Sequence, residues 1–170
     1  MAESSVTRAM VGLLPRRLAA ALALLLVAQG VAAGQAVDRA AAFAMQDAVN
    51  FAREYHELDP LSLDVDLSRA AQDHAEDLAR RGELSHRSLD GGRLVDRLRV
   101  VGYRYRLAAE NLAAGPPRAD SAVILWLDSP GHRRNLLLEG VTAIGVGYAK
   151  AASPEDRFRH YWVLVLAAGR

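Results

Sequence analysis

Three residues of this sequence have the types and the settings that chemistry requires. His86 lies in a polar loop of sequence SHRSLDGG, and His132 lies in SPGHRRN, at the start of an expected short helix. Between them, Glu110 lies in AENLAAG, a segment of small residues that cannot easily hide a charge alone. Catalytic zinc commonly takes three such ligands and a water. His86, Glu110 and His132 are therefore candidate ligands for zinc or another divalent metal.

The spacing of these residues also allows roles that are purely structural. His86, Glu110 and His132 match no local ligand motif such as H-E-x-x-H. Glu110 would then accept hydrogen bonds from backbone amides, and His132 would cap a helix. Asn111 would hold a turn through its side chain. On spacing alone we favour these structural roles.

Ser129 and His132 are close enough in sequence for a hydroxyl to approach an imidazole within one helical turn. A serine nucleophile also needs an orienting group and an oxyanion hole, and no G-x-S-x-G motif surrounds Ser129. Pro130 follows it directly. This order predicts that Ser129 is a helix N-cap with proline at the first helical position.

The elements that must position these residues change in kind along the chain. Apolar residues recur at helical spacing in the first part, where His74 and Trp126 are expected to lie on packed helix faces. Asp66 is the expected N-cap and Gly82 the expected C-cap of the second helix. Helices first and strands last indicate an α+β fold, with helices packed on a small sheet whose last two strands are antiparallel. The expected helices are 39–57, 67–81, 93–101, 120–127 and 131–138, and the expected strands are 103–109, 144–148 and 161–166.

Length and composition limit the classes of protein to consider. The 170 residues are 51% hydrophobic and 24% charged, which suits one globular domain with an appendage. A net charge of +1 provides no basic field for nucleic acid, so no nucleic-acid partner is expected. The absence of cysteine excludes disulfides and thiolate metal sites.

Residues 1–36 have the pattern of a secretory signal peptide. Arg8, Arg16 and Arg17 precede an apolar run over 18–28, and small residues follow. The run is shorter than the ~20 residues that a spanning helix needs. The alternative is an uncleaved membrane anchor, and membrane association is expected only if this leader is retained. Cleavage would leave residues 37–170 as the mature domain.

Seven segments, taken in order, form a recognisable set: HAEDLARRGELSH, DGG, DRLRVVGY, AENLAAG, WLDSPGHRRNLL, IGVGYA and YWVLVL. This set resembles the bacterial branch of the CAP superfamily, also called the SCP domain (cysteine-rich secretory proteins, antigen 5, pathogenesis-related 1). The resemblance covers about residues 46–168 and implies a three-layer α-β-α sandwich, in which helices cover both faces of a small antiparallel sheet.

The resemblance also implies a cleft with two histidines and two acidic residues. His86 and His132 match the two histidines, and Glu110 matches the acidic residue of the E-N-L motif, beside Asn111. The second acidic residue follows the family's tryptophan, where this chain has Asp128-Ser129. Ser129 is the nearest match, so the set of four is incomplete.

The function expected from this resemblance is binding rather than catalysis. We expect a protein that is secreted, to the periplasm or the exterior, and that binds a lipid or cell-envelope ligand in the His/Glu cleft. One alternative is a metal-dependent, peptidase-like hydrolase in which His86 and His132 hold the metal and Glu110 is a third ligand or the general base. The other is a structural extracellular domain whose cleft residues only stabilise the fold.

Overall fold

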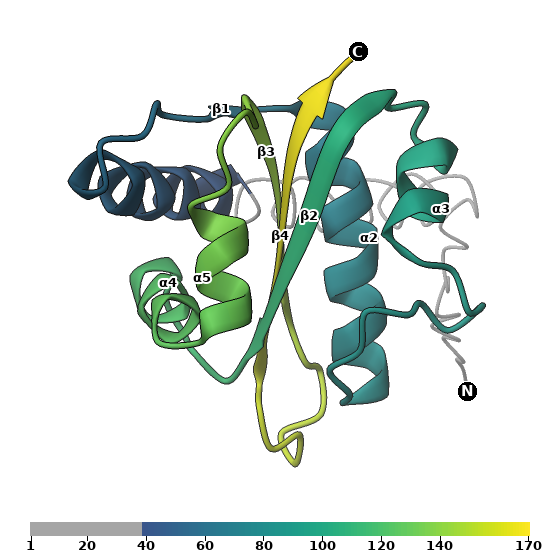
Figure 1. The fold of residues 1–170 in the computed structure, drawn as a ribbon. Coiled ribbons are helices and arrows are strands. Elements are labelled where there is room, and N and C mark those ends of the chain that lie inside the picture. The colour runs from purple at the N-terminus through teal and green to yellow at the C-terminus, as the bar shows by residue number, and fades with distance from the viewer. Residues whose placement is uncertain (1–38) are drawn as a thin grey trace, which may run out of the picture. The chain divides into compact units, whose positions relative to one another are not determined.

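A four-stranded sheet lies between two layers of helices in the computed structural model, which describes residues 39–170 (Figure 1). The predicted signal peptide lies outside these residues. On one face of the sheet lie a helix over residues 39–55, α4 and α5, and on the other face lie α2 and α3. The described residues thus contain all five predicted helices and form the three-layer sandwich. The other elements are β1 (Ser62–Leu63), α2 (Val65–Arg81), α3 (Leu94–Val100), β2 (Tyr105–Ala114), α4 (Ala119–Leu127), α5 (Pro130–Leu136), β3 (Ala143–Lys150) and β4 (His160–Gly169).

The strands occur in the order β1-β3-β4-β2. β4 is antiparallel to both β3 and β2, as predicted for the last two strands, whereas the two-residue β1 pairs with β3 in parallel and was not predicted. β2 extends to Ala114, beyond the expected end at residue 109. Glu110 and Asn111 therefore lie inside an edge strand, where alternation sends neighbouring side chains to opposite faces.

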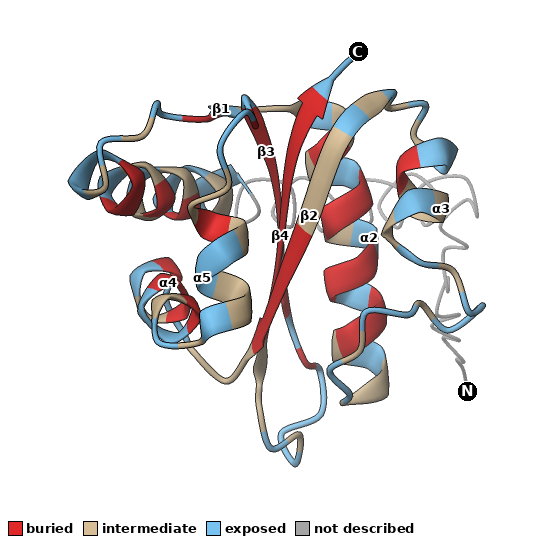
Figure 2. Ribbon diagram, in the orientation of Figure 1, coloured by how far each residue is buried: buried red, intermediate tan, exposed pale blue. Residues whose placement is uncertain are grey.

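Each face of the sheet has its own hydrophobic core (Figure 2). Trp126, which is fully buried as predicted, packs with Leu164 on the face covered by α4 and α5. Leu98 of α3 and Val165 belong to the other core. β4 is buried on both faces, which explains the unbroken apolar run in its sequence.

The ends of α2 are fixed by residues on either side of it. Asp64, not the predicted Asp66, is the N-cap, and its carboxylate accepts hydrogen bonds from the backbone N–H groups of Asp66 and Leu67, each at 2.9 Å. The helix begins earlier than its apolar pattern indicates, so Asp66 falls in the first turn, where a negative charge is also favourable. Gly82 ends the helix with a φ of 63°, as predicted.

Two glycines of β3 let the backbone of α2 pack directly against the backbone of the sheet. A Cβ atom at Gly145 would lie 2.1 Å from the carbonyl carbon of Leu67, and one at Gly147 would lie 2.2 Å from the carbonyl oxygen of Ala71. The side chain of Gln72 bonds both the N–H and the carbonyl of Tyr148, at 3.0 and 3.1 Å. These contacts fix α2, and with it the loop that carries His86.

Candidate functional site

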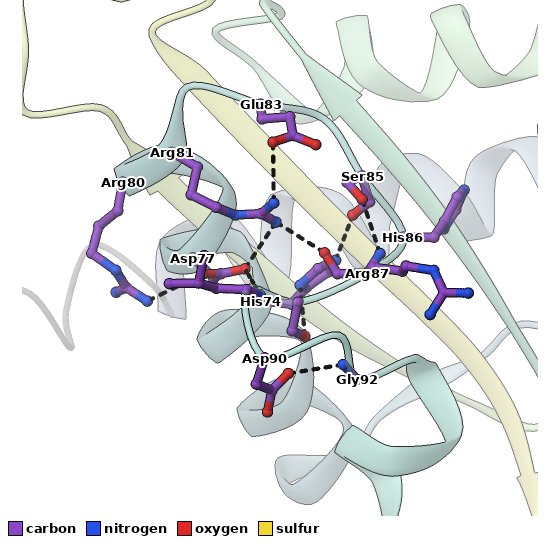
Figure 3. A network of polar contacts seen from close by, with 12 residues as sticks. His74, Asp77, Arg80, Arg81, Glu83, Ser85, His86, Arg87, Asp90 and Gly92 are labelled. Atoms are coloured by element: carbon purple, nitrogen blue, oxygen red, sulfur yellow. Dashed lines mark hydrogen bonds and ion pairs between the residues drawn. The ribbon is translucent and has the colours of Figure 1, made fainter.

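The loop that carries His86 is held by α2 on both sides of this residue. The ring Nε2 of His74 lies 2.9 Å from the carbonyl oxygen of Ser85, and Arg81 donates to the carbonyl oxygen of Arg87, also at 2.9 Å. His74 is 1% exposed, so the prediction that it packs inside is confirmed. Figure 3 shows that the side chain of His86 extends away from this network. The backbone is therefore fixed while the imidazole stays accessible.

Glu110 joins His86 to a cation from α3. Its Oε1 lies 2.8 Å from Nδ1 of His86, and its Oε2 accepts a hydrogen bond from the guanidinium of Arg97. The Glu110 side chain is 4% exposed and that of Arg97 10%, whereas that of His86 is 61% exposed. A carboxylate only accepts hydrogen bonds, so Nδ1 of His86 carries the hydrogen and Nε2 is left free.

The charge of Glu110 is stabilised by these two partners. Burial raises the pKa of the carboxyl group, but the hydrogen bond from His86 and the positive charge of Arg97 outweigh that effect, so the net pKa lies below its usual value. Arg97 and His86 therefore keep Glu110 ionised in the folded protein.

His132 is positioned from the opposite face of β2. Asn111 donates to the carbonyl oxygen of His132 at 2.9 Å and accepts from Asn135 at the same distance. Ser129 occupies the N-cap position of α5, as predicted, but its side chain makes no capping bond; its Oγ lies 3.0 Å from Nδ1 of His132. Burial, followed by the charge of His86, lowers the pKa of His132.

Arg53 anchors the other end of α5. It donates to the carbonyl oxygens of Leu136 and Leu138, at 2.9 and 3.1 Å, and is 2% exposed. Cationic side chains at a helix C-terminus satisfy its free carbonyls and interact favourably with its dipole. Helix 39–55, which carries Arg53, thus helps to hold the helix that presents His132.

The predicted site residues therefore meet as two groups on either side of one strand. Glu110 is opposite Val165 in β4 and faces α2 and α3, whereas Asn111 is opposite Leu164 and faces α5. Asp128 is exposed, and Ser129, its neighbour, makes the contact with His132.

The predicted metal ligands do not have the arrangement of a metal centre. Across residues 39–170, no group of three or more His, Cys, Asp or Glu side chains is placed to hold a metal ion. Both oxygens of Glu110 have partners, one of them the cation of Arg97. The donor set around Glu110 thus does not fit a divalent metal.

Sequence reasoning missed Arg97 and Asn135. Arg97 is one of several arginines in and beside α3. Helical spacing puts it on another face than the exposed Arg99, but it does not indicate that Arg97 pairs with Glu110. Asn135 belongs to a helix of one to two turns, where an asparagine suggests no particular partner.

A separate, apolar groove lies between helix 39–55 and α4. It has a volume of about 1070 Å³, just above the usual range of ligand pockets. The aromatic rings of Tyr148 and Trp162, with centroids 4.3 Å apart, also line it. Its further apolar lining includes Ala44, Ala48, Phe51, Val123, Ile124 and Leu127.

The layered fold, together with the pairing of His86 and Glu110 at the edge strand, defines a CAP (SCP) domain. Residues 46–166 match the model of the cysteine-rich secretory protein family, CAP, and the chain belongs to this family.

Two relatives of known sequence are proteins of Bacillus subtilis. The chain is 35% identical over 104 residues to the Bacillus subtilis protein YkwD, and 37% identical over 101 residues to the Bacillus subtilis membrane protein YlbC. These matches cover 61% and 59% of this chain but only 40% and 29% of the two relatives, so the chain spans less than half the length of the curated relatives it matches.

Solved structures of bacterial proteins, one of them with an SCP domain, share this fold. An extracellular SCP-domain protein from Bacillus anthracis superimposes with a TM-score of 0.66 at 30% identity, over 76% of this chain and 40% of that one. An outer surface protein of Borrelia burgdorferi shares the fold, with a TM-score of 0.64 at 23% identity over 72% and 87% of the two chains. Within residues 39–170, no helix has the length and apolar character to cross a membrane.

Proposed function

We propose that this protein is a non-enzymatic extracellular binding module that holds an apolar ligand, such as the acyl chain of an envelope lipid. The single observation that carries this proposal is the groove between helix 39–55 and α4. A large concave site with mostly apolar walls and few polar groups is the usual form of a small-ligand site.

The groove suits such a ligand better than the His/Glu cleft in which we expected it. In the cleft, Glu110 is already bonded to His86 and Arg97, so an apolar chain would have to displace paired charges. In the groove, by contrast, the lining residues Phe51 and Ile124 are 75% and 60% exposed. An acyl chain that covers these side chains would gain roughly 25 cal/mol for each Å² of apolar surface removed from water.

The polar residues that line the groove give a reason for preferring amphiphiles to plain hydrocarbons. Asp47, His56, Arg118 and Asp120 line it together with the apolar side chains. Arg118 and Asp120 form an ion pair with each other. A ligand with an apolar chain and a polar head would match both kinds of surface.

Binding of a fluorescent fatty acid to the purified chain tests this proposal. We expect saturable binding that is lost in Ala44→Trp, because Ala44 is exposed in the groove and an indole there would occupy the space of the ligand. Ala152→Trp is the matched control, since Ala152 is also exposed but lies in the loop between β3 and β4. Equal binding by both variants and the wild type would refute the groove as the site, and no saturable binding at all would refute the ligand class.

A further inference from the structure

We propose that Arg97 is the resident cation of the His86–Glu110 pair: its guanidinium holds the carboxylate oxygen that a divalent metal would need, and completes the pair without a metal. Arg97 is then a positioning residue, which acts on His86 through Glu110. This inference is independent of the groove and its ligand.

The first support is that the carboxylate has no free oxygen. Oε1 of Glu110 is bonded to Nδ1 of His86, and Oε2 to Nη2 of Arg97. With a side chain only 4% exposed, Glu110 has little room to take another partner without releasing one of these two. A metal ion at Glu110 would therefore have to displace Arg97 or His86.

The second support is that Arg97 is built into its place. Its Nη1 donates to Oγ of Ser88 at 3.0 Å, with the carbonyl oxygens of His86 and Gly92 also in reach at 3.4 and 3.5 Å. Its Nε is buried without a hydrogen-bond partner in the described part of the chain. An unmatched buried donor opposes burial of this side chain, so the charge of Glu110 is the main reason for its inward position.

Arg99 shows what an arginine of α3 does without such a partner. Residues two apart on a helix point in directions about 200° apart, because each residue turns by about 100°. Arg99 accordingly lies on the outer face, with a side chain 74% exposed and an ion pair to Asp96. The two arginines of this helix thus differ in surroundings, and of the two only Arg97 reaches Glu110.

The consequence is a histidine that is oriented without a metal. Because Arg97 keeps Glu110 ionised, Nδ1 of His86 stays bonded to the carboxylate, and Nε2 stays free to accept a hydrogen bond. The cation that fixes this arrangement is covalently part of the chain and cannot be removed by a chelator.

Zinc titration of the purified full chain by calorimetry tests the inference, with four proteins compared. We expect the wild type and Arg99→Met to bind Zn²⁺ equally weakly. We expect Arg97→Met to bind it about 10- to 100-fold more tightly, the range over which neighbouring groups alter metal affinity. Adding Glu110→Gln to Arg97→Met should abolish the gain in Zn²⁺ affinity, because it removes the carboxylate that Arg97→Met sets free.

Two results would overturn the inference. One is tight binding of one Zn²⁺ by the wild type that Glu110→Gln removes. The other is a folded Arg97→Met variant, judged by its circular dichroism, that gains no affinity.

The wild type supplies a measurement that needs no folded variant. The imidazole NMR signals of His86 should stay unchanged by one equivalent of Zn²⁺ and by EDTA. Signals that shift on addition of Zn²⁺ and return with the chelator would also overturn the inference.

Discussion

The substitution Glu110→Gln tests whether the contacts of Glu110 with His86 and Arg97 stabilise the fold. It keeps the shape of the side chain and removes its charge. Arg97, with a side chain 10% exposed, would then be a buried cation facing a neutral amide. His86 would lose a charged acceptor, but its side chain is 61% exposed and can bond to water instead. Most of the lost unfolding free energy is therefore due to the uncompensated charge of Arg97.

The expected loss of unfolding free energy at pH 7 is about 3 kcal/mol. Removing one partner of a buried ion pair typically costs about 3–5 kcal/mol, because the other charge stays buried without compensation. The lower end applies here, since the amide oxygen of glutamine can still accept a hydrogen bond from Arg97. An exposed ion pair contributes only about 0–1 kcal/mol.

Urea unfolding followed by circular dichroism measures this loss, with Asp66→Asn as the control. Asp66 pairs with Arg69 at 3.0 Å, and the two side chains are 47% and 57% exposed. With an m-value of roughly 2 kcal/mol per molar urea, Glu110→Gln should lower the midpoint by about 1.5 M. The control should lower it by less than about 0.5 M.

The same prediction fixes how the stability difference between the wild type and Glu110→Gln changes with pH. The pKa of Glu110 is lower in the folded than in the unfolded chain, so its ionisation stabilises the fold above the unfolded pKa. This contribution is lost as the pH falls from about 4.5 through the folded pKa. The difference in unfolding free energy between the wild type and Glu110→Gln should therefore become smaller in that pH range. Equal losses of unfolding free energy in Glu110→Gln and Asp66→Asn at pH 7 would refute the role assigned to Arg97 and Glu110. A difference between the wild type and Glu110→Gln that grows on acidification would refute it too.

Two further predictions concern the elements that carry the site. Gly147→Ala should lower the unfolding free energy by about 3 kcal/mol or more, because its Cβ would lie 2.2 Å from the carbonyl oxygen of Ala71 and the backbone of α2 would have to shift. Thermal unfolding measures this loss. A near-normal melting temperature would contradict the close packing of α2 on β3. Asp64→Ala should cost about 1 kcal/mol through loss of the N-cap of α2, whereas Asp66→Ala should cost less; the reverse order in urea unfolding would restore Asp66 as the cap.

Local signals in the sequence predicted most of the fold. Apolar spacing together with helix-ending residues such as proline and glycine predicted all five described helices, and Gly82 marked the end of α2 because a left-handed φ favours glycine. Alternation around Gly145 and Gly147 predicted a strand, although only the structure shows that these glycines admit the backbone of α2. The family resemblance, not periodicity, supplied the layering.

The site was harder to predict because its contacts are long-range. The resemblance pointed to His86, Glu110 and His132, but no spacing indicates that Glu110 pairs with Arg97 rather than with a metal. That pairing depends on which face of α3 meets β2. It also depends on the register of β2, since neighbouring residues of a strand point to opposite faces.

The polar residues of β2 themselves help to select that register. β4 is apolar on both faces, so its side chains discriminate weakly between Glu110 opposite Val165 and a pairing shifted by one residue. A one-residue slip would turn Glu110 toward the core that contains Leu164 and away from Arg97, which would bury a carboxylate without its cation. It would equally turn Asn111 away from Asn135, leaving amide groups unpaired. Glu110 and Asn111 therefore disfavour the shifted pairing of β2 with β4, which gives them a structural role whatever the protein binds.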